Sequence, residues 1–441
     1  MAVGCLAVLP PGSGTGIRAV TTGGAISRGS MTRVGAATVV TAICGYLVLY
    51  LAARFLEPAG FSIFGVFWGA FGLVTGAANG LLQQTTREIR LALLSGEDRA
   101  ARSAANIGAG PDSTTHPMRV AAGVGLVSGL LIAGTAVGWA RHVFVEHTVL
   151  SVLLLAVGLA CFCLHATLLG VLAGDNRWTQ YGALMVTDAG IRVAVAVATV
   201  LAGWGLGGFL WATVAGSVAW LLLLITSPAA RSAARLTAHE RPSSFLRGAS
   251  HAVAAAGASA ILVMGFPVLL QATSGELGAA GGVVILAVTL TRAPLLVPLT
   301  AMQGNLIAHF VDERGHRLRA LVSPVVLVAG VGAVGVTLAY LLGPWLLRVG
   351  FGEDYVTSGA LLGWLTAGAV AIAVLTVTGA ATVAAALHRA YSLGWVGATV
   401  AAAGLLMLPM ELEHRTIVAL LCGPLIGIAV HVAALAVSGR R

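Results

Sequence analysis

Long apolar stretches, separated by short segments that contain arginine, repeat along the whole chain. A helix of roughly 20 apolar residues crosses the hydrocarbon core of a bilayer, which is about 30 Å thick. By this measure we predict about twelve membrane spans. They lie at residues 34–53, 60–84, 120–140, 149–173, 181–202, 206–226, 251–271, 279–309, 320–342, 358–386, 391–410 and 416–437. The pattern therefore predicts an all-α integral membrane protein.

The predicted spans divide into two equal groups, which predicts two six-helix lobes. Residues 31–226 form the first predicted lobe and residues 251–441 the second, with residues 227–250 as an arginine-rich cytoplasmic linker. Because six spans return the chain to its starting side, we expect a pseudo-two-fold axis along the membrane normal to relate the lobes. Residues 1–30, rich in glycine, serine and threonine, are predicted to be a disordered tail or to precede a native start at Met31.

The basic residues, all 25 of them arginine, predict the topology of the chain. With the N-terminus inside, 19 arginines lie in cytoplasmic segments, 4 in outer loops and 2 within spans. Such an excess on the inner side follows the positive-inside rule. Because the arginines lie between apolar spans and not on one solvated face, the net charge of +9 does not indicate nucleic acid as a partner. We expect a multi-pass protein of the plasma membrane with both termini in the cytoplasm.

Composition excludes a separate soluble domain. The chain is 58% hydrophobic and only 9% charged, whereas soluble domains carry about 25% charged residues. The five cysteines form no CxxC pair, and the histidines show no HExxH spacing. No catalytic constellation is visible in the short loops. We therefore expect no enzyme, no metal and no cofactor, and the bilayer itself is the first partner.

One arginine lies near the middle of the predicted span 279–309. Placing an arginine such as Arg292 at mid-membrane costs about 2.5–3.5 kcal/mol on insertion scales. Such a residue faces the protein interior or a watery cavity, so we expect this helix to line a central cavity that handles an anion. A guanidinium suits this role because it binds phosphate oxygens in pairs and keeps its charge. The alternative is a structural arginine that donates to carbonyls freed where Pro294 and Pro298 break the helix.

Four further polar residues are candidates for the transport path. Asp188 and Arg192 lie four apart on the predicted span 181–202, hence on one helix face. They either neutralise each other, or Asp188 serves as a gate or as a proton or sodium site while Arg192 contacts substrate. Arg87 follows the second span and is a candidate contact for an incoming headgroup, or a topology anchor. Gln303 is a candidate cavity residue or a bridge between helices.

Two motifs resemble those of a known transporter family. Residues 53–61 read ARFLEPAGF, where Glu57 replaces a usual glycine, and residues 343–355 read GPWLLRVGFGEDY. Both resemble the polysaccharide and lipid-linked oligosaccharide flippases of the multidrug/oligosaccharidyl-lipid/polysaccharide exporter superfamily. The resemblance covers the chain from Met31 onward.

Membership of that family implies two lobes that form a V around a central cavity lined by spans one, two, seven and eight. It also implies alternating access that carries a polyprenyl-diphosphate-linked glycan, a cell-envelope precursor, from the cytoplasmic to the outer leaflet. Cationic cavity residues in such flippases hold the diphosphate, and Arg292 fits that role by position. Glycan-assembly enzymes are the partners that this reading implies.

Two other functions stay open at the level of sequence. A multidrug or small-cation exporter on the same fold would use buried acids, for which Asp188 is the candidate. A membrane glycan polymerase or glycosyltransferase would need a large outer loop with acids or arginines, and the short loops disfavour it.

Overall fold

The computed structural model describes residues 28–104, 114–313 and 317–438. Within these ranges the chain is helical almost throughout, apart from short turns and one isolated bridge between Thr115 and Ala238. Of the predicted tail, residues 1–30, the first 27 residues lie outside the described part of the chain.

The first lobe contains the helices of the N-terminal half. They are α1 (Arg28–Phe55), α2 (Glu57–Ala104), α3 (Pro117–Val143), α4 (Thr148–Gly174), α5 (Trp178–Ala202), α6 (Gly205–Ala215), the 3-10 turn η1 (Gly216–Val218) and α7 (Ala219–Thr226). The α2 helix continues well beyond the predicted span that ends at residue 84, because a helix need not end where its apolar pattern does. Helix α8 (Pro228–Ala234) then leads toward the second lobe.

The second lobe contains the helices of the C-terminal half. They are α9 (Pro242–Val263), α10 (Phe266–Ser274), α11 (Gly278–Ala301), α12 (Gln303–Asp312), α13 (Arg317–Phe351), the 3-10 turn η3 (Glu353–Tyr355), α14 (Gly359–Ala384), α15 (His388–Leu406) and α16 (Leu412–Ser438). The seventh predicted span, residues 251–271, is thus broken between α9 and α10.

The fold is the predicted all-α integral membrane architecture of two lobes. In the described ranges, 11 helices are long and apolar enough to cross a membrane. The predicted span at 391–410 corresponds to α15, which is not among them. Its polar first turn, with His388 and Arg389, lowers the mean hydropathy of this short helix.

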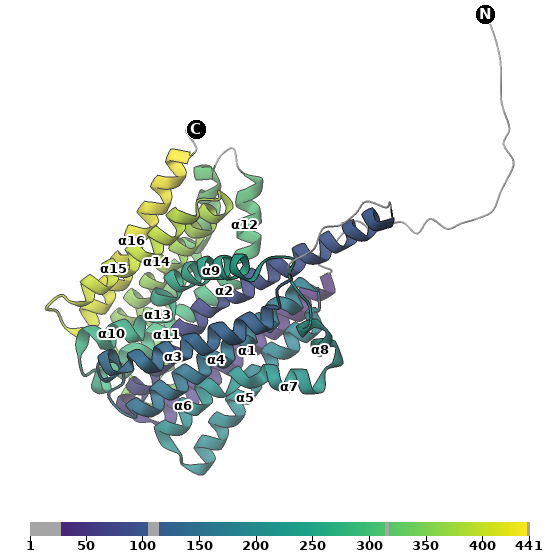
Figure 1. The fold of residues 1–441 in the computed structure, drawn as a ribbon. Helices are drawn as coiled ribbons and strands as arrows, with labels where there is room; N and C mark the ends of the chain where they lie inside the picture. The colour runs from purple at the N-terminus through teal and green to yellow at the C-terminus, as the bar shows by residue number, and fades with distance from the viewer. Residues whose placement is uncertain (1–27, 105–113, 314–316, 439–441) are drawn as a thin grey trace, which may run out of the picture.

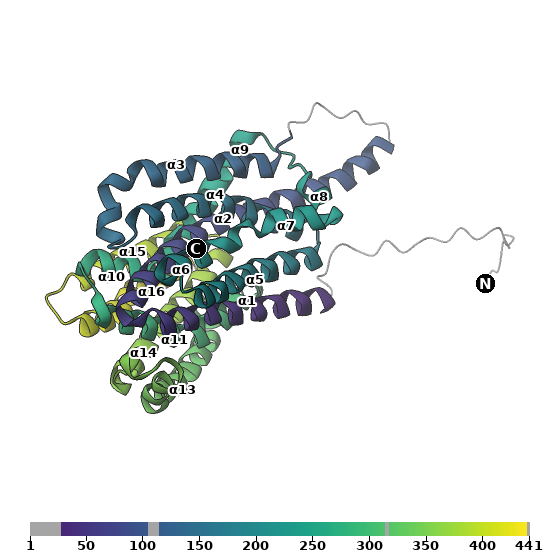
Figure 2. The same ribbon diagram turned by 90° about the horizontal axis from the view of Figure 1, so that it is seen from below.

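Figure 1 shows the two lobes as a V. The first lobe, purple to teal, and the second, green to yellow, meet at the lower left and diverge toward the top and the right. The start of α1 and the end of α16 lie on the diverging side. Seen from below in Figure 2, α1 lies beside α5 on one face of the first lobe, and α3 lies on the opposite face.

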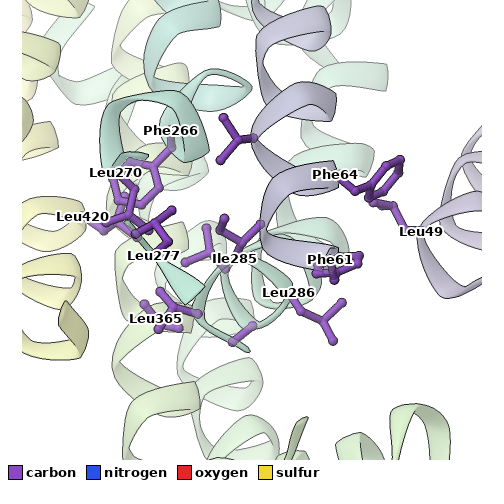
Figure 3. Packing of buried hydrophobic residues seen from close by; sticks show 14 of the residues in the cluster. Leu49, Phe61, Phe64, Phe266, Leu270, Leu277, Ile285, Leu286, Leu365 and Leu420 are labelled. Carbon is purple, nitrogen blue, oxygen red and sulfur yellow. The ribbon is translucent and has the colours of Figure 1, made fainter. Parts of the chain in front are cut away.

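Apolar side chains from both lobes join where the lobes meet. Figure 3 shows Leu49, Phe61 and Phe64 of the first lobe opposite Ile285 and Leu286 of α11. All five are buried. The burial of aromatic and branched side chains across this junction stabilises the contact between the lobes at one end of the V.

Helix α2 packs closely against the second lobe because one of its faces lacks side chains. The glycines on this face recur every three or four residues and contact α9, α10 and α11; they are Gly65, Gly69, Gly72, Gly76 and Gly80. A Cβ atom at Gly80 would lie 2.3 Å from the backbone nitrogen of Val253. Small residues let membrane helices approach backbone to backbone, so this glycine face permits the close contact of α2 with α9.

Candidate functional site

The side chain of Arg292 extends from α11 to the break between α9 and α10. Its Nη1 donates hydrogen bonds to the carbonyl oxygens of Leu262, at 3.4 Å, and Val263, at 3.2 Å. Its guanidinium carbon lies 4.9 Å from the centre of the Phe266 ring, within the range of a cation–π interaction. With 6% of its surface exposed, Arg292 is buried at this junction.

Pro267 explains why carbonyl oxygens are available there. In a continuous helix the N–H of residue 267 would pair with the carbonyl of Val263, but proline has no N–H. The chain turns at Met264 and Gly265 and resumes as α10 at Phe266. Gly69 of α2 lies against this turn, where a Cβ would come within 3.1 Å of the Met264 carbonyl oxygen. The arginine therefore supplies the donor that the proline removes.

The sequence allowed Arg292 to donate to carbonyls freed by a break in its own helix, at Pro294 and Pro298. The arginine does not bind there. Helix α11 continues through Pro294 and Pro298 and ends at Ala301. The carbonyls that accept from Arg292 belong to the neighbouring helix, and the sequence signal for them is Pro267. That proline lies inside the seventh predicted span, where it marks a break that the apolar pattern alone does not show.

Part of the Arg292 guanidinium has no protein partner. Its Nε and Nη2 atoms are buried and form no hydrogen bond. No carboxylate pairs with Arg292 in the part of the chain that the structure describes. A buried cation with free donors can accept an anion with two acceptor oxygens, such as a phosphate.

Asp188 and Arg192 form a pair inside the first lobe. The Arg192 Nε and Nη2 atoms donate to the two carboxylate oxygens of Asp188 at 3.1 and 3.0 Å. The Arg192 Nη1 donates to the carbonyl of Thr213 on α6, and the guanidinium lies 5.4 Å from the centre of the Phe71 ring. Both carboxylate oxygens are thus occupied by one guanidinium.

The helix break at η1 makes room for this pair. A Cβ atom at Gly216 would lie 2.3 Å from Asp188 Oδ1 and 2.6 Å from Arg192 Nε. Only glycine at position 216 allows the backbone of the sixth span to approach this ion pair so closely. The 3-10 turn η1 starts at the same residue, and the carbonyl of Thr213 just before it accepts a hydrogen bond from Arg192. The pair therefore ties α5 to the broken sixth span.

Arg87 and Gln303 lie at other places. The side chain of Arg87 is 68% exposed and pairs with the buried Glu88 at 3.2 Å. Gln84 also donates to Glu88, at 3.1 Å. Gln303 is partly buried and begins α12. In the described residues, no contact joins Arg292 to Arg87, Arg192 or Gln303, so the candidates form separate sites and not one cluster.

Side chains from both lobes interlock at the end of the V that holds the α1–α2 turn and η3, which we call the joined end. Arg54 donates to the carbonyl of Phe351 at 3.3 Å, and the rings of Tyr50 and Phe351 lie 5.6 Å apart. Tyr355 reaches across to Phe61, with ring centres 6.0 Å apart. The two sequence motifs, at residues 53–61 and 343–355, thus meet here.

Within residues 28–104, 114–313 and 317–438, acidic and histidine side chains do not gather into a metal centre. Among the residues with described positions, no group of three or more His, Cys, Asp or Glu side chains is arranged to hold a metal ion. The sequence did not single out the Glu88–Gln84 pair. His431, an isolated histidine in the sequence and expected to be an interior or interfacial residue, is buried in the second lobe.

Comparison with known proteins places the chain in a family. No family model matches it. Uncharacterized protein Rv3630 of Mycobacterium tuberculosis is 67% identical over 415 residues, which cover 94% of each chain. Uncharacterized protein Rv1510 of the same species is 65% identical over 413 residues, 94% of this chain and 93% of that protein. The chain belongs to the family of these mycobacterial proteins.

Solved structures share the fold of the chain. The inward-facing conformation of a multidrug resistance MATE family transporter of the MOP superfamily matches with a TM-score of 0.67 and 14% identity, over 91% of this chain and 99% of that one. The outward-facing conformation of such a transporter matches with a TM-score of 0.62 and 15% identity, over 93% and 96%. A MOP superfamily transporter from Pyrococcus furiosus, described as having a binding pocket of reverse polarity, matches with a TM-score of 0.59 and 14% identity, over 93% and 96%. This chain therefore has the fold of these MOP superfamily transporters.

Proposed function

We propose that the protein moves a polyprenyl-diphosphate-linked glycan from the cytoplasmic to the outer leaflet of the plasma membrane by alternating access. The observation that carries this proposal is the buried guanidinium of Arg292, which has no carboxylate partner among the described residues and two nitrogens without acceptors. A diphosphate supplies the charge and the oxygens that such a group lacks. Glycan-assembly enzymes are the partners that would supply this lipid.

The charges favour an anionic substrate over a cationic one. A cation exporter needs a buried acid that is free to bind its substrate or a coupling ion. Both oxygens of Asp188, the candidate from the sequence, bind Arg192. By contrast, Arg292 donates only to backbone carbonyls. The MOP superfamily relative from P. furiosus, with its reverse-polarity pocket, is a precedent for a change of charge on this fold.

The joined end suggests which state the structure represents. If the joined end faces outward, as the arginine distribution predicts, the outer side is closed and the lobes diverge toward the cytoplasm. Transport then requires the contacts of Arg54 and Tyr355 to open while the other ends of the lobes close. The higher TM-score to the inward-facing transporter supports this assignment.

Proteoliposomes offer a direct test. A fluorescent polyprenyl-diphosphate oligosaccharide is placed in one leaflet, and its appearance in the other is followed with wild type, Arg292→Ala and Arg292→Lys. We expect Arg292→Ala to slow flipping by about 10- to 100-fold, the equivalent of one hydrogen bond to a charged group. Arg292→Lys keeps the positive charge but loses the paired N–H donors of the guanidinium, so we expect a flipping rate between those of wild type and Arg292→Ala.

Arg415 provides a matched control. It also donates to backbone carbonyls at helix ends, to Leu406 at 3.2 Å and Thr273 at 3.5 Å, and its Nε also lacks a partner. It is on α16, however, and not at the α9–α10 break. Arg415→Ala should leave flipping near the wild-type rate. Equal rates for Arg292→Ala and wild type would show that Arg292 is structural.

The second candidate, a multidrug exporter, is favoured by the match to MATE family transporters. The same proteoliposomes, loaded with a cationic fluorescent dye, test it. Transport of the dye in the absence of lipid flipping would replace the proposal with this alternative.

A further inference from the structure

The second lobe contains a histidine that is completely enclosed by helices. His431 of α16 has no exposed surface. It follows Gly423 and Gly427 at intervals of four, so the three residues lie on one face of α16. The two glycines pack against α15, where a Cβ at Gly427 would lie 2.5 Å from the Gly394 carbonyl oxygen. The imidazole therefore occupies a position where the pattern of this face calls for a small residue.

The neighbouring helix is shaped to hold the imidazole. A Cβ atom at Gly394 would lie 2.1 Å from His431 Nε2, so any other residue at that position would displace the ring. The ring of Tyr391, one turn earlier on α15, stacks on the imidazole with an angle of 6° and centres 6.2 Å apart. Ionisable residues inside a membrane are costly, which makes a purpose-built site for one a functional feature by default.

The two ring nitrogens have different partners. Nε2 lies 3.2 Å from the backbone carbonyl of Tyr391, which can only accept, so Nε2 carries a hydrogen. Nδ1 lies 3.0 Å from the hydroxyl of Thr378 on α14, which can donate or accept. The Thr378 hydroxyl also lies 3.0 Å from the carbonyl of Leu375.

This arrangement accommodates both protonation states. In the neutral ring, Thr378 donates to Nδ1. When a proton adds to Nδ1, the new N–H donates to the Thr378 oxygen, and the hydroxyl turns to donate to the Leu375 carbonyl. Neither state leaves the ring with an unpaired buried polar atom, which is the usual obstacle to binding a proton in an apolar core.

Few other groups face the ring. Thr378 comes from α14 and Tyr391 from α15, and Tyr391 is the titratable one. Helices α11 and α13 also pack on α16, and in the described residues they bring no charged group to the imidazole. Among the described residues, an added proton would therefore be the one charge at this site. It would change the hydrogen bonds of the ring to Thr378 on α14 and Tyr391 on α15.

The site has a physical link to the contact between α2 and α9. Helix α15, which carries Tyr391, packs against α9. Ala260 of α9 in turn packs against Gly76 on the glycine face of α2, where an added Cβ would lie 2.7 Å from the Ala260 Cβ. A change at His431 can thus reach the α2–α9 contact through α15.

We propose that His431 is a proton-binding residue of the second lobe and that its protonation drives the movement of the lobes during transport. The coupling half of this inference rests on the proposed transport function. The proton-binding half stands on the geometry of the site alone.

The proton-binding half is tested without any substrate. The full-length protein, with 15N-labelled histidine, is placed in nanodiscs, and imidazole signals are recorded between about pH 5 and 8, where histidine titrates. The difference between wild type and His431→Gln isolates this ring from the other histidines. We expect the Nδ1 signal of His431 to titrate in this range. A signal that stays in one state would overturn the proposal.

Thr378 provides a second variant in case His431→Gln does not fold. Thr378→Val removes the hydroxyl and should shift the titration of His431, while Thr378→Ser should restore it. A titration that is the same in all three proteins would contradict the role of Thr378 as the switching partner.

The coupling half is tested in proteoliposomes with an imposed proton gradient and the fluorescent polyprenyl-diphosphate oligosaccharide. We expect the gradient to change the wild-type flipping rate by about fivefold or more, the lower end of usual coupling strengths, and to leave His431→Gln unaffected. His165→Gln is the control, since His165 is a buried histidine of the first lobe that stacks on Phe162. It should keep the gradient dependence.

The outcomes separate the two proposals. Equal gradient dependence in wild type and His431→Gln overturns the coupling. If wild type does not move the lipid at all, the proposed transport function fails, while a titrating His431 still supports the proton site.

Discussion

Arg292 donates a hydrogen bond to the carbonyl oxygen of Val263, 3.2 Å away, which Pro267 leaves without its helical donor. Residues on two successive helices thus depend on each other, because the carbonyls freed by the break before α10 accept hydrogen bonds from a side chain of α11. The contact also holds a positive charge beside the junction of α9, α10 and α2. Under the proposed function, an anion that draws Arg292 away would release the carbonyls of the break and would thereby link substrate binding to the shape of the seventh span.

The hydrogen bond of Arg292 to the Val263 carbonyl predicts that substitutions of Arg292 and Pro267 have non-additive effects on the free energy of unfolding. Arg292→Ala leaves two buried carbonyls unpaired and should lower the free energy of unfolding by about 1–3 kcal/mol. In the background of Pro267→Ala the cost should be smaller, because the new N–H can pair with Val263. Unfolding of the four proteins in micelles measures the coupling. Strictly additive effects would show that the proline does not create the site.

The pair of Asp188 and Arg192 predicts a different pattern. Asp188→Leu leaves a buried cation without its partner and should cost about 3–5 kcal/mol of stability. Adding Arg192→Met removes that cation, so the double variant should be much closer to wild type. Thermal unfolding of both variants in nanodiscs checks this.

Flipping by the same double variant separates the two roles considered for Asp188. If the pair is structural, the double variant should still move the lipid and respond to a gradient as wild type does. Loss of the response in a folded double variant would favour Asp188 as the coupling site.

The glycine face of α2 predicts a local steric effect. Gly80→Ala places a methyl group against the backbone of Val253, where only 2.3 Å is available, and should cost about 1–3 kcal/mol. Gly45→Ala on α1 is the control, since nothing lies within 4 Å of its added Cβ. It should be neutral or stabilise the helix by up to about 1 kcal/mol. Equal unfolding midpoints for the two variants would contradict the close contact of α2 and α9.

Tyr355 at the joined end predicts a dependence on alkaline pH. Its side chain is buried, and its hydroxyl has no hydrogen-bond partner. Burial, followed by the charges of Asp354 and Glu57, raises the pKa of Tyr355 above its ordinary value. Because the folded state disfavours the phenolate, the stability of wild type is complete below about pH 10 and falls as the pH rises above it.

Tyr355→Phe should remove this part of the alkaline loss. It keeps the ring contact with Phe61 and should not destabilise the protein at neutral pH, since no hydrogen bond is lost. Unfolding midpoints measured from neutral to alkaline pH compare the two proteins, with Tyr340→Phe, an exposed side chain on α13, as the control. Parallel profiles for wild type and Tyr355→Phe would contradict the prediction.

The sequence by itself determined the helical membrane class and the approximate places of the spans. Hydropathy is a local property, because about 20 consecutive apolar residues are enough to cross the bilayer whatever the rest of the chain does. The pairing of Asp188 with Arg192 was open to the same reasoning, because residues four apart share a helix face. The lobe boundaries at residues 31–226, 227–250 and 251–441 stay predictions, as do the roles of Arg87 and Gln303.

Tertiary structure alone decided the partners of Arg292, the glycine face between α2 and α9, and the enclosure of His431. In each case the contact joins different helices, and periodicity along one helix does not identify the helix that packs against it. Pro294 and Pro298 lie next to Arg292 in sequence, yet the free carbonyls come from the break before Pro267. These contacts are determined by packing between helices, where small residues permit close approach and buried polar atoms must form hydrogen bonds.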